Sequence, residues 1–204
     1  MDIKNDIHIM EMNDKLYQRL KQSELVIHAK VESILRQISS WKYATHEFYV
    51  PAPYQNELAG LPNGRIRKNI EEKDRLKIAG LYSFGFNAEG KILCSQEAPD
   101  NIGNGIITDI YEYDNAFSYY VYHVKYIPNQ YTTIISISYF YPYHEMNIFQ
   151  GINSYKDWSV YLYEYDKERI SKVHRYASRW DNMPAEEYNF AYENNLLCAI
   201  VGEK

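Results

Sequence analysis

The first forty or so residues carry a helical pattern of apolar positions. Apolar side chains recur at steps of three, four or seven residues, at Leu16, Leu20, Ile27, Val31, Ile34 and Ile38. This spacing is that of one face of an α-helix, and Asn13 and Asp14 are residue types that cap helices. We therefore predict one helix from about Asp14 to about Ser39, with its apolar stripe packed on a sheet. A heptad seam is the alternative, although Ser23 and Glu24 interrupt the stripe.

The next segment, Trp41 to Gly80, has no regular period. Residues Glu47 to Val50 are of strand-forming types, but Pro51 and Pro53 exclude a regular central strand directly after them. We predict a long irregular excursion here, with a short helix around Asn69 to Lys77.

Beyond Gly80, short runs of β-branched and aromatic residues alternate with turn-forming residues. No helix of comparable length separates these runs, so antiparallel hairpins are the expected connection, because parallel strands need long crossovers. The predicted fold is α+β and mainly β, an N-terminal helix packed on an antiparallel β-meander of repeated hairpins. The predicted strands are Leu81 to Phe86, Lys91 to Ser95, Ile106 to Tyr113, Ser118 to Ile127, Thr132 to Tyr141, Ser159 to Tyr165, Ile170 to Tyr176, Glu187 to Tyr192 and Leu196 to Val201.

These runs repeat along the chain. An aromatic residue precedes an acidic or amide residue at the end of four runs, at Phe86, Tyr113, Tyr165 and Tyr192, with separations of 27, 52 and 27 residues. A degenerate copy at Tyr139 to Glu145 divides the longer gap. A period of this length predicts one hairpin per copy.

The segment Phe86-Asn87-Ala88-Glu89-Gly90-Lys91-Ile92 and the two Tyr-Glu-Tyr-Asp motifs, at Tyr111 to Asp114 and Tyr163 to Asp166, resemble the tyrosine-aspartate repeats of large bacterial toxin-delivery shells. This resemblance implies hairpin geometry after Gly80, with too few copies to wind a closed shell. In general style, a small acidic chain rich in Tyr, Ile and Asn is similar to the immunity proteins of bacterial polymorphic toxins. That likeness implies a bacterial, cytoplasmic protein that binds another protein.

Length and composition fit a folded, single-domain chain. The 204 residues are 46% hydrophobic and 24% charged, which excludes a disordered tail, and 22 tyrosines stand against 7 phenylalanines. We expect one domain over residues 1–204, divided into a helical segment (1–40), the excursion (41–80) and the hairpins (81–204). The net charge of −5 argues against nucleic acid and permits a basic protein partner.

The sequence contains no complete motif for catalysis or for metal binding. His144-Glu145 begins like a zinc-protease helix motif, but Ile148 stands where the second histidine should be. The histidines are dispersed, so we predict no metal, no cofactor and no enzymatic activity. Cys94 and Cys198 are expected to be reduced and at least partly buried. No long apolar run indicates a membrane segment or a signal peptide, so the expected location is the cytoplasm.

Tyrosines at alternate strand positions suggest a binding face, because alternation places them on one side of a sheet. If Val160 and Leu162 face the helix, the tyrosines beside them face outward, where tyrosine is a frequent anchor of protein interfaces. Neighbouring acids would attract a basic toxin. The predicted partner-binding residues are Tyr120, Tyr122, Tyr161, Tyr163, Asp109, Glu112, Asp114, Glu164 and Asp166.

Two other functions stay open at this stage. One is a small-molecule-binding curved sheet or barrel in which tyrosines line an aromatic pocket. The other is an enzyme, which would bring polar side chains with perturbed pKa values into one cleft.

Overall fold

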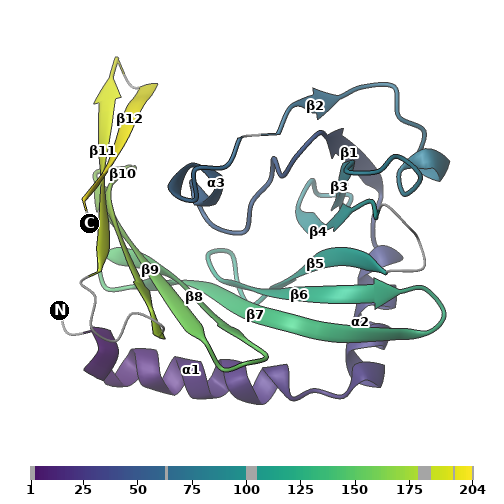
Figure 1. The fold of residues 1–204 in the computed structure, drawn as a ribbon, viewed down its shortest axis with the longest axis horizontal. Coiled ribbons are helices and arrows are strands. Elements are labelled where there is room, and N and C mark those ends of the chain that lie inside the picture. The colour runs from purple at the N-terminus through teal and green to yellow at the C-terminus, as the bar shows by residue number, and fades with distance from the viewer. Residues whose placement is uncertain (1–2, 63, 100–104, 179–184, 195, 204) are drawn as a thin grey trace. The chain divides into compact units, whose positions relative to one another are not determined.

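The computed structural model describes residues 3–62, 64–99, 105–178, 185–194 and 196–203. It confirms a mainly antiparallel β fold with helices in the N-terminal part of the chain (Figure 1). The helices are α1 (Ile7–Leu20), α2 (Glu24–Leu35) and α3 (Gln55–Leu58). The strands are β1 (Ser40–Ala44), β2 (Ile66–Arg67), β3 (Tyr82–Phe86), β4 (Ile92–Glu97), β5 (Ile106–Tyr113), β6 (Tyr119–Ile127), β7 (Tyr131–Tyr143), β8 (Met146–Asn153), β9 (Trp158–Asp166), β10 (Arg169–Ala177), β11 (Glu186–Glu193) and β12 (Leu196–Glu203).

The strands form a meander. Hydrogen-bonded neighbours follow the order β12-β11-β10-β9-β8-β7-β6-β5-β4-β3-β1-β2, so that from β3 onward each strand lies beside the next strand in sequence. Short hairpin connections make this arrangement, as the absence of crossover helices in the sequence predicts. Strand β8 was not among the predicted strands.

The predicted repeat marks the hairpin turns. Phe86 and Tyr113 end β3 and β5, Tyr143 ends β7, and Tyr165 and Tyr192 stand one residue before the ends of β9 and β11. Several of the turns that follow use left-handed backbone, with φ of 54° at His144, 61° at Lys167 and 49° at Asn194. One hairpin per copy is therefore confirmed, including the degenerate copy at Tyr139 to Glu145.

The prediction of one long helix is wrong. The chain forms two helices, and the break falls where Ser23 accepts a hydrogen bond from the backbone N–H of Val26 at 3.4 Å and caps α2. α1 begins seven residues earlier than expected, because Asp6 accepts hydrogen bonds from the N–H groups of His8 and Ile9, at 3.0 and 3.2 Å.

The chain forms two compact units. Unit 1 comprises Met1–Leu20, Tyr113–Tyr120 and Ile137–Lys204, and unit 2 comprises Lys21–Glu112 and Val121–Ser136. Each unit contains one of the two N-terminal helices. The single-domain organisation over residues 1–204 stays a prediction.

In unit 1, α1 packs on β8 (Figure 1). Its buried residues are Ile9, Met12 and Leu16. A fully buried glutamine of β8 fixes the helix: Gln150 Nε2 donates to the carbonyl of Ile9 at 2.8 Å and to Asn13 Oδ1 at 2.9 Å, and its Oε1 accepts from the Tyr141 hydroxyl at 2.9 Å. Both polar atoms of this amide are thus satisfied inside the core by three hydrogen bonds, as burial requires.

In unit 2, α2 buries Ile27 and Val31. The long excursion holds β1 and α3, and a 3₁₀ turn at Glu72–Asp74 replaces the short helix predicted around Asn69 to Lys77. The predicted strand-like stretch from Glu47 to Val50 forms no strand. Instead Tyr49 packs edge-on against Phe84 and Phe86 of β3, with ring centroids 5.1 and 5.2 Å apart. This contact anchors the excursion to the sheet.

Candidate functional site

The predicted tyrosine anchors of β6 are buried against the helices. Tyr122 has no exposed area, and Lys30 of α2 places its ammonium 4.3 Å from the ring centroid and donates to the hydroxyl at 3.1 Å. Tyr120 is 8% exposed and lies under Arg19 of α1, 3.8 Å from the ring centroid. Rings covered in this way offer no contact surface, so their placement on an exposed face is wrong.

The tyrosines of β9 lie on the opposite side from α1, as their parity predicted. Val160 pairs with Gln150, the residue that holds α1, which places Tyr161 and Tyr163 on the other face. Tyr163 is nevertheless fully buried, beside Tyr161 and Phe140 at centroid distances of 6.5 and 6.2 Å. Burial raises the pKa of its phenol. The second face of the sheet therefore packs aromatic rings on one another, and Tyr163 is a core residue rather than an outward anchor.

The five predicted acids have separate surroundings. Asp109 is buried and bonded to His123, and Glu112 pairs with Lys30, both within unit 2. In unit 1, Asp114 accepts from the Tyr139 hydroxyl at 2.9 Å. Asp166 is exposed at the end of β9, and Glu164 lies half-exposed two residues before it. Glu164 and Asp166 are the acids that stay accessible beside each other.

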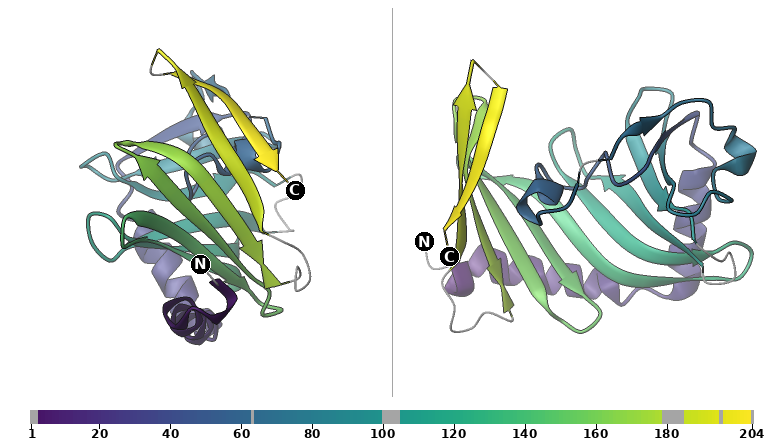
Figure 2. Two further views of the ribbon diagram at one scale, coloured as in Figure 1. Left: turned by 90° about the vertical axis from the view of Figure 1, so that its left-hand side faces the viewer. Right: turned by 45° about the horizontal axis from the view of Figure 1, so that its top comes forward.

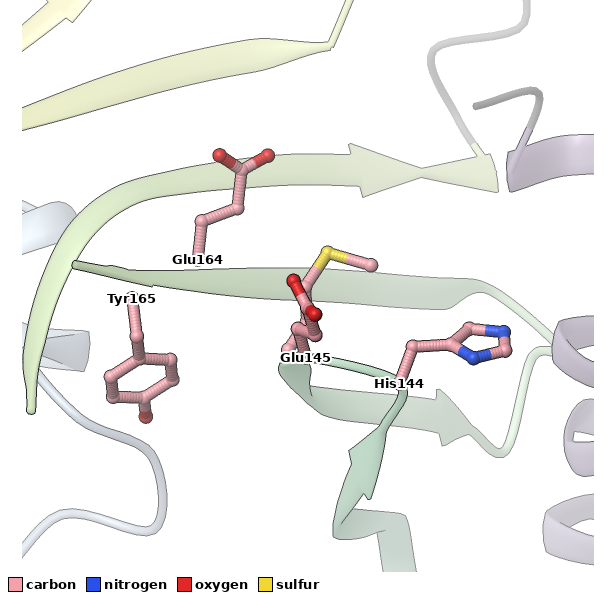
Figure 3. Close-up of a pocket in the computed structure, with 5 residues that line it drawn as sticks. His144, Glu145, Glu164 and Tyr165 are labelled. Atoms are coloured by element: carbon pink, nitrogen blue, oxygen red, sulfur yellow. The ribbon is translucent and has the colours of Figure 1, made fainter. Parts of the chain in front are cut away.

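Glu164 lines a hollow of 560 Å³ in unit 1 together with His144, Glu145, Met146 and Tyr165. His144 and Glu145 form the β7–β8 turn, and Figure 3 shows the side chains of Glu164 and Tyr165 leaving β9 in opposite directions. Asn147 donates to the Tyr165 hydroxyl at 2.9 Å and holds that ring in place. The lining of the hollow includes two carboxylates, which favour a cationic group over an anionic one.

A histidine of β10 connects these acids to the next hairpin. His174 Nε2 lies 2.9 Å from Glu164 Oε1, and its Nδ1 lies 3.4 Å from Glu187 Oε2 of β11. Lys172 also pairs with Glu187, at 2.7 Å, and these bonds lower the pKa of that carboxyl. Strand register explains this row of Glu164, His174 and Glu187. His174 is opposite Glu187 of β11 and Leu162 of β9, and Glu164 lies two residues from Leu162 on the same strand.

A second polar cluster occupies unit 2, and the sequence did not indicate it. Asp109 Oδ1 accepts from His123 Nδ1 at 2.7 Å, and its Oδ2 accepts from the Ser95 hydroxyl at 3.2 Å. Because a carboxylate is only an acceptor, Nδ1 of His123 carries the proton and Nε2 has the lone pair in the neutral ring. The His123 side chain is 38% exposed, so its free edge reaches solvent.

Three groups in and beside this cluster, His123, Glu47 and Tyr82, have raised pKa values. The bond from Asp109 raises the pKa of His123, and burial, followed by the charge of Asp109, raises the pKa of the Glu47 carboxyl. Burial and the neighbouring Glu97 raise the pKa of Tyr82, which pairs with Glu97 across β3 and β4. Perturbed groups gathered in one place are a feature of functional sites, and also of structural ion-pair networks.

The two cysteines differ from each other. Cys94 is free and buried, and burial raises the pKa of its thiol to about 12. Cys198 is free and exposed on β12, so the expectation that it is at least partly buried is wrong.

Within the described residues, no three His, Cys, Asp or Glu side chains are grouped so as to hold a metal ion. In the same part of the chain, no helix has both the length and the apolar character needed to cross a membrane. Comparisons with family models, with curated proteins and with solved structures give no match for this chain.

Proposed function

We propose that this protein is a non-catalytic protein-binding module, an immunity-type inhibitor that acts in the bacterial cytoplasm by covering a basic toxin domain. The main support for this proposal is the distribution of net charge between the two units. By sequence, unit 1 has fifteen acidic and ten basic residues, a net of −5, whereas unit 2 has twelve of each, a net of zero. The whole acidic surplus of the chain therefore belongs to unit 1.

This concentration supports a basic partner. A surface with one predominant sign of charge attracts an oppositely charged domain and speeds its association more than it tightens the final complex. Glu145, Glu164 and Asp166 give unit 1 accessible carboxylates beside a hollow. Tyr163 and Tyr120 are buried and are not part of the surface proposed to meet the partner.

The test uses the full chain against purified basic toxin domains encoded in the same genome. We expect one of them to lose activity at a one-to-one ratio, with association that slows as salt rises. Asp166→Lys should slow association several-fold, and Glu89→Lys, the same charge change at an exposed turn of unit 2, should have a much smaller effect. Equal effects of the two variants, or the absence of any inhibited toxin, would contradict the proposal.

A second candidate function, binding of a small polar molecule, is favoured by the Glu47, Asp109 and His123 cluster of unit 2. A hollow of 340 Å³ lies next to it, lined among others by Glu97 and Lys125. Register places Glu97 on the same face of β4 as Ser95, which bonds Asp109. The described lining has no aromatic ring, which differs from the expected aromatic pocket. Ligands that raise the melting temperature of the native chain but not of His123→Ala would support this site.

A further inference from the structure

The terminal strand β12 has an open edge. In the described part of the chain it pairs with β11, in a register from Glu187 opposite Glu203 to Glu193 opposite Leu196, and it stands last in the strand order. Figure 2 shows the hairpin, in yellow, at the end of the series of strands in unit 1. Along the edge of such a strand, every second residue directs its N–H and C=O groups away from the sheet, ready to pair with another chain.

The apolar part of β12 has neither lysine nor proline to protect its edge, although the strand has a bulge at Cys198, where the register with β11 shifts. Residues Leu196 to Val201 are six consecutive apolar residues, without a charge or a proline. Leu196 is 71% exposed and Val201 is 55% exposed. Natural edge strands are commonly shielded by lysine, proline or an inward charge, because an apolar open edge invites pairing. An exposed apolar edge without lysine or proline can accept a further strand.

The charges of the hairpin decide which chain would pair. Residues 185–203 contain four glutamates and no lysine, arginine or histidine. Lys172 and Arg175 of β10 pair with Glu187 and Glu186, at 2.7 and 3.0 Å, but no cation lies within the hairpin itself. A second copy of this chain would bring a second hairpin with the same acidic composition. A basic strand would meet opposite charge instead.

We propose that β12 receives an extended segment of the partner, with alternating basic and apolar residues, as an added strand of the sheet. In this mode, main-chain hydrogen bonds supply affinity and alternate side chains supply specificity. The apolar side chains of the segment would lie beside Leu196 and Val201, and the negative charge of the hairpin would favour its basic side chains. The inference rests on the proposed function, since it names the part of the basic partner that binds.

The probe is a fluorescein-labelled seven-residue peptide of alternating lysine and valine, titrated with the full chain and followed by fluorescence anisotropy. N-methylation of the internal lysine and valine amides removes the main-chain donors on both edges of the peptide and leaves the charge unchanged, and it should weaken binding at least tenfold. Val201→Lys should weaken binding to a similar degree. Leu25→Lys is the matched control, because Leu25 is an exposed apolar residue (81%) of α2, and it should bind as the native chain does.

Three outcomes would overturn the inference. Equal affinity for the N-methylated peptide would show that charge alone drives binding. Dimerisation of the native chain in sedimentation, abolished by Val201→Lys, would assign the edge to a second copy. The proposed function fails separately: if Val201→Lys still neutralises a basic toxin as well as the native chain, strand addition is wrong and the immunity function stands. If the peptide binds as expected and no toxin is inhibited, strand addition stands and the immunity function is wrong.

Discussion

Replacing Gln150 by leucine should destabilise the protein strongly although the two side chains have similar size. The side chain is fully buried and makes three hydrogen bonds, to Ile9, Asn13 and Tyr141. Each such bond contributes about 0.5–1.5 kcal/mol net, and a buried partner left without its bond costs about 1–3 kcal/mol. Some partners will reach water at the edge of α1, so we expect a total loss of about 3 kcal/mol.

The assay is urea unfolding of the native chain and its variants, followed by far-ultraviolet circular dichroism. Gln18→Leu is the matched control: Gln18 is exposed on α1, and the change should stay within about 0.5 kcal/mol. Tyr141→Phe removes one of the three bonds and should cost about 1 kcal/mol. The double variant of Gln150 and Tyr141 should lose less than the sum of the two single losses, because the two groups are direct partners. A loss below about 0.5 kcal/mol for Gln150→Leu would refute the role given to this amide.

Three further predictions concern unit 2 and the cysteines. Ile27→Ala on α2, fully buried, should cost about 2–5 kcal/mol and lower the melting temperature in calorimetry; an unchanged temperature would make α2 a free arm. A thiol reagent should label exposed Cys198 quickly in the native protein and buried Cys94 only after denaturant is added, and fast labelling of Cys94 would contradict its burial. The raised pKa values of Glu47 and His123 stabilise the fold at low pH, and this stabilisation is lost as the pH rises through them. The stability difference between the native chain and His123→Ala should therefore shrink as the pH rises above about 6.5, the ordinary pKa of histidine. Glu47→Gln should be more stable than the native chain at pH 7. Opposite slopes in urea unfolding would refute this.

The strands could be predicted because their signals are local. Runs of β-branched and aromatic residues between turn residues predicted nine of the strands from β3 onward. β8 was missed because Gln150 and Gly151 interrupt its apolar pattern. Both are explained only by distant contacts: Gln150 bonds α1, and a Cβ at Gly151 would lie 2.5 Å from the Ser138 hydroxyl. Neither partner is visible from the local sequence.

The single-helix prediction failed for a related reason. A step of seven residues from Leu20 to Ile27 keeps the apolar stripe in phase across the break, so periodicity alone joins α1 and α2. The better signal was Ser23 followed by Glu24, a cap and an acidic first turn, which together mark the start of a helix. The two residues that interrupt the stripe are the start of α2.

The candidate sites were predictable only in part. Strand parity correctly separated Val160 and Leu162 from Tyr161 and Tyr163, but it says nothing of what covers the second face. The cluster in unit 2 joins segments far apart in the chain, so no motif could reveal it. One signal was available: Asp109 interrupts an apolar strand, and a charge there requires a partner.

The meander has a consequence for synthesis on the ribosome. Each hairpin finds its neighbours soon after it emerges, but α1 does not, because the bond between Gln150 and Ile9 spans 141 residues. At about 5–20 residues per second, α1 waits roughly 7–28 s before β8 has been made. During that interval Ile9, Met12 and Leu16 have no sheet to cover them. The apolar face of α1 is thus left uncovered during translation, and the arrival of β8 ends that exposure.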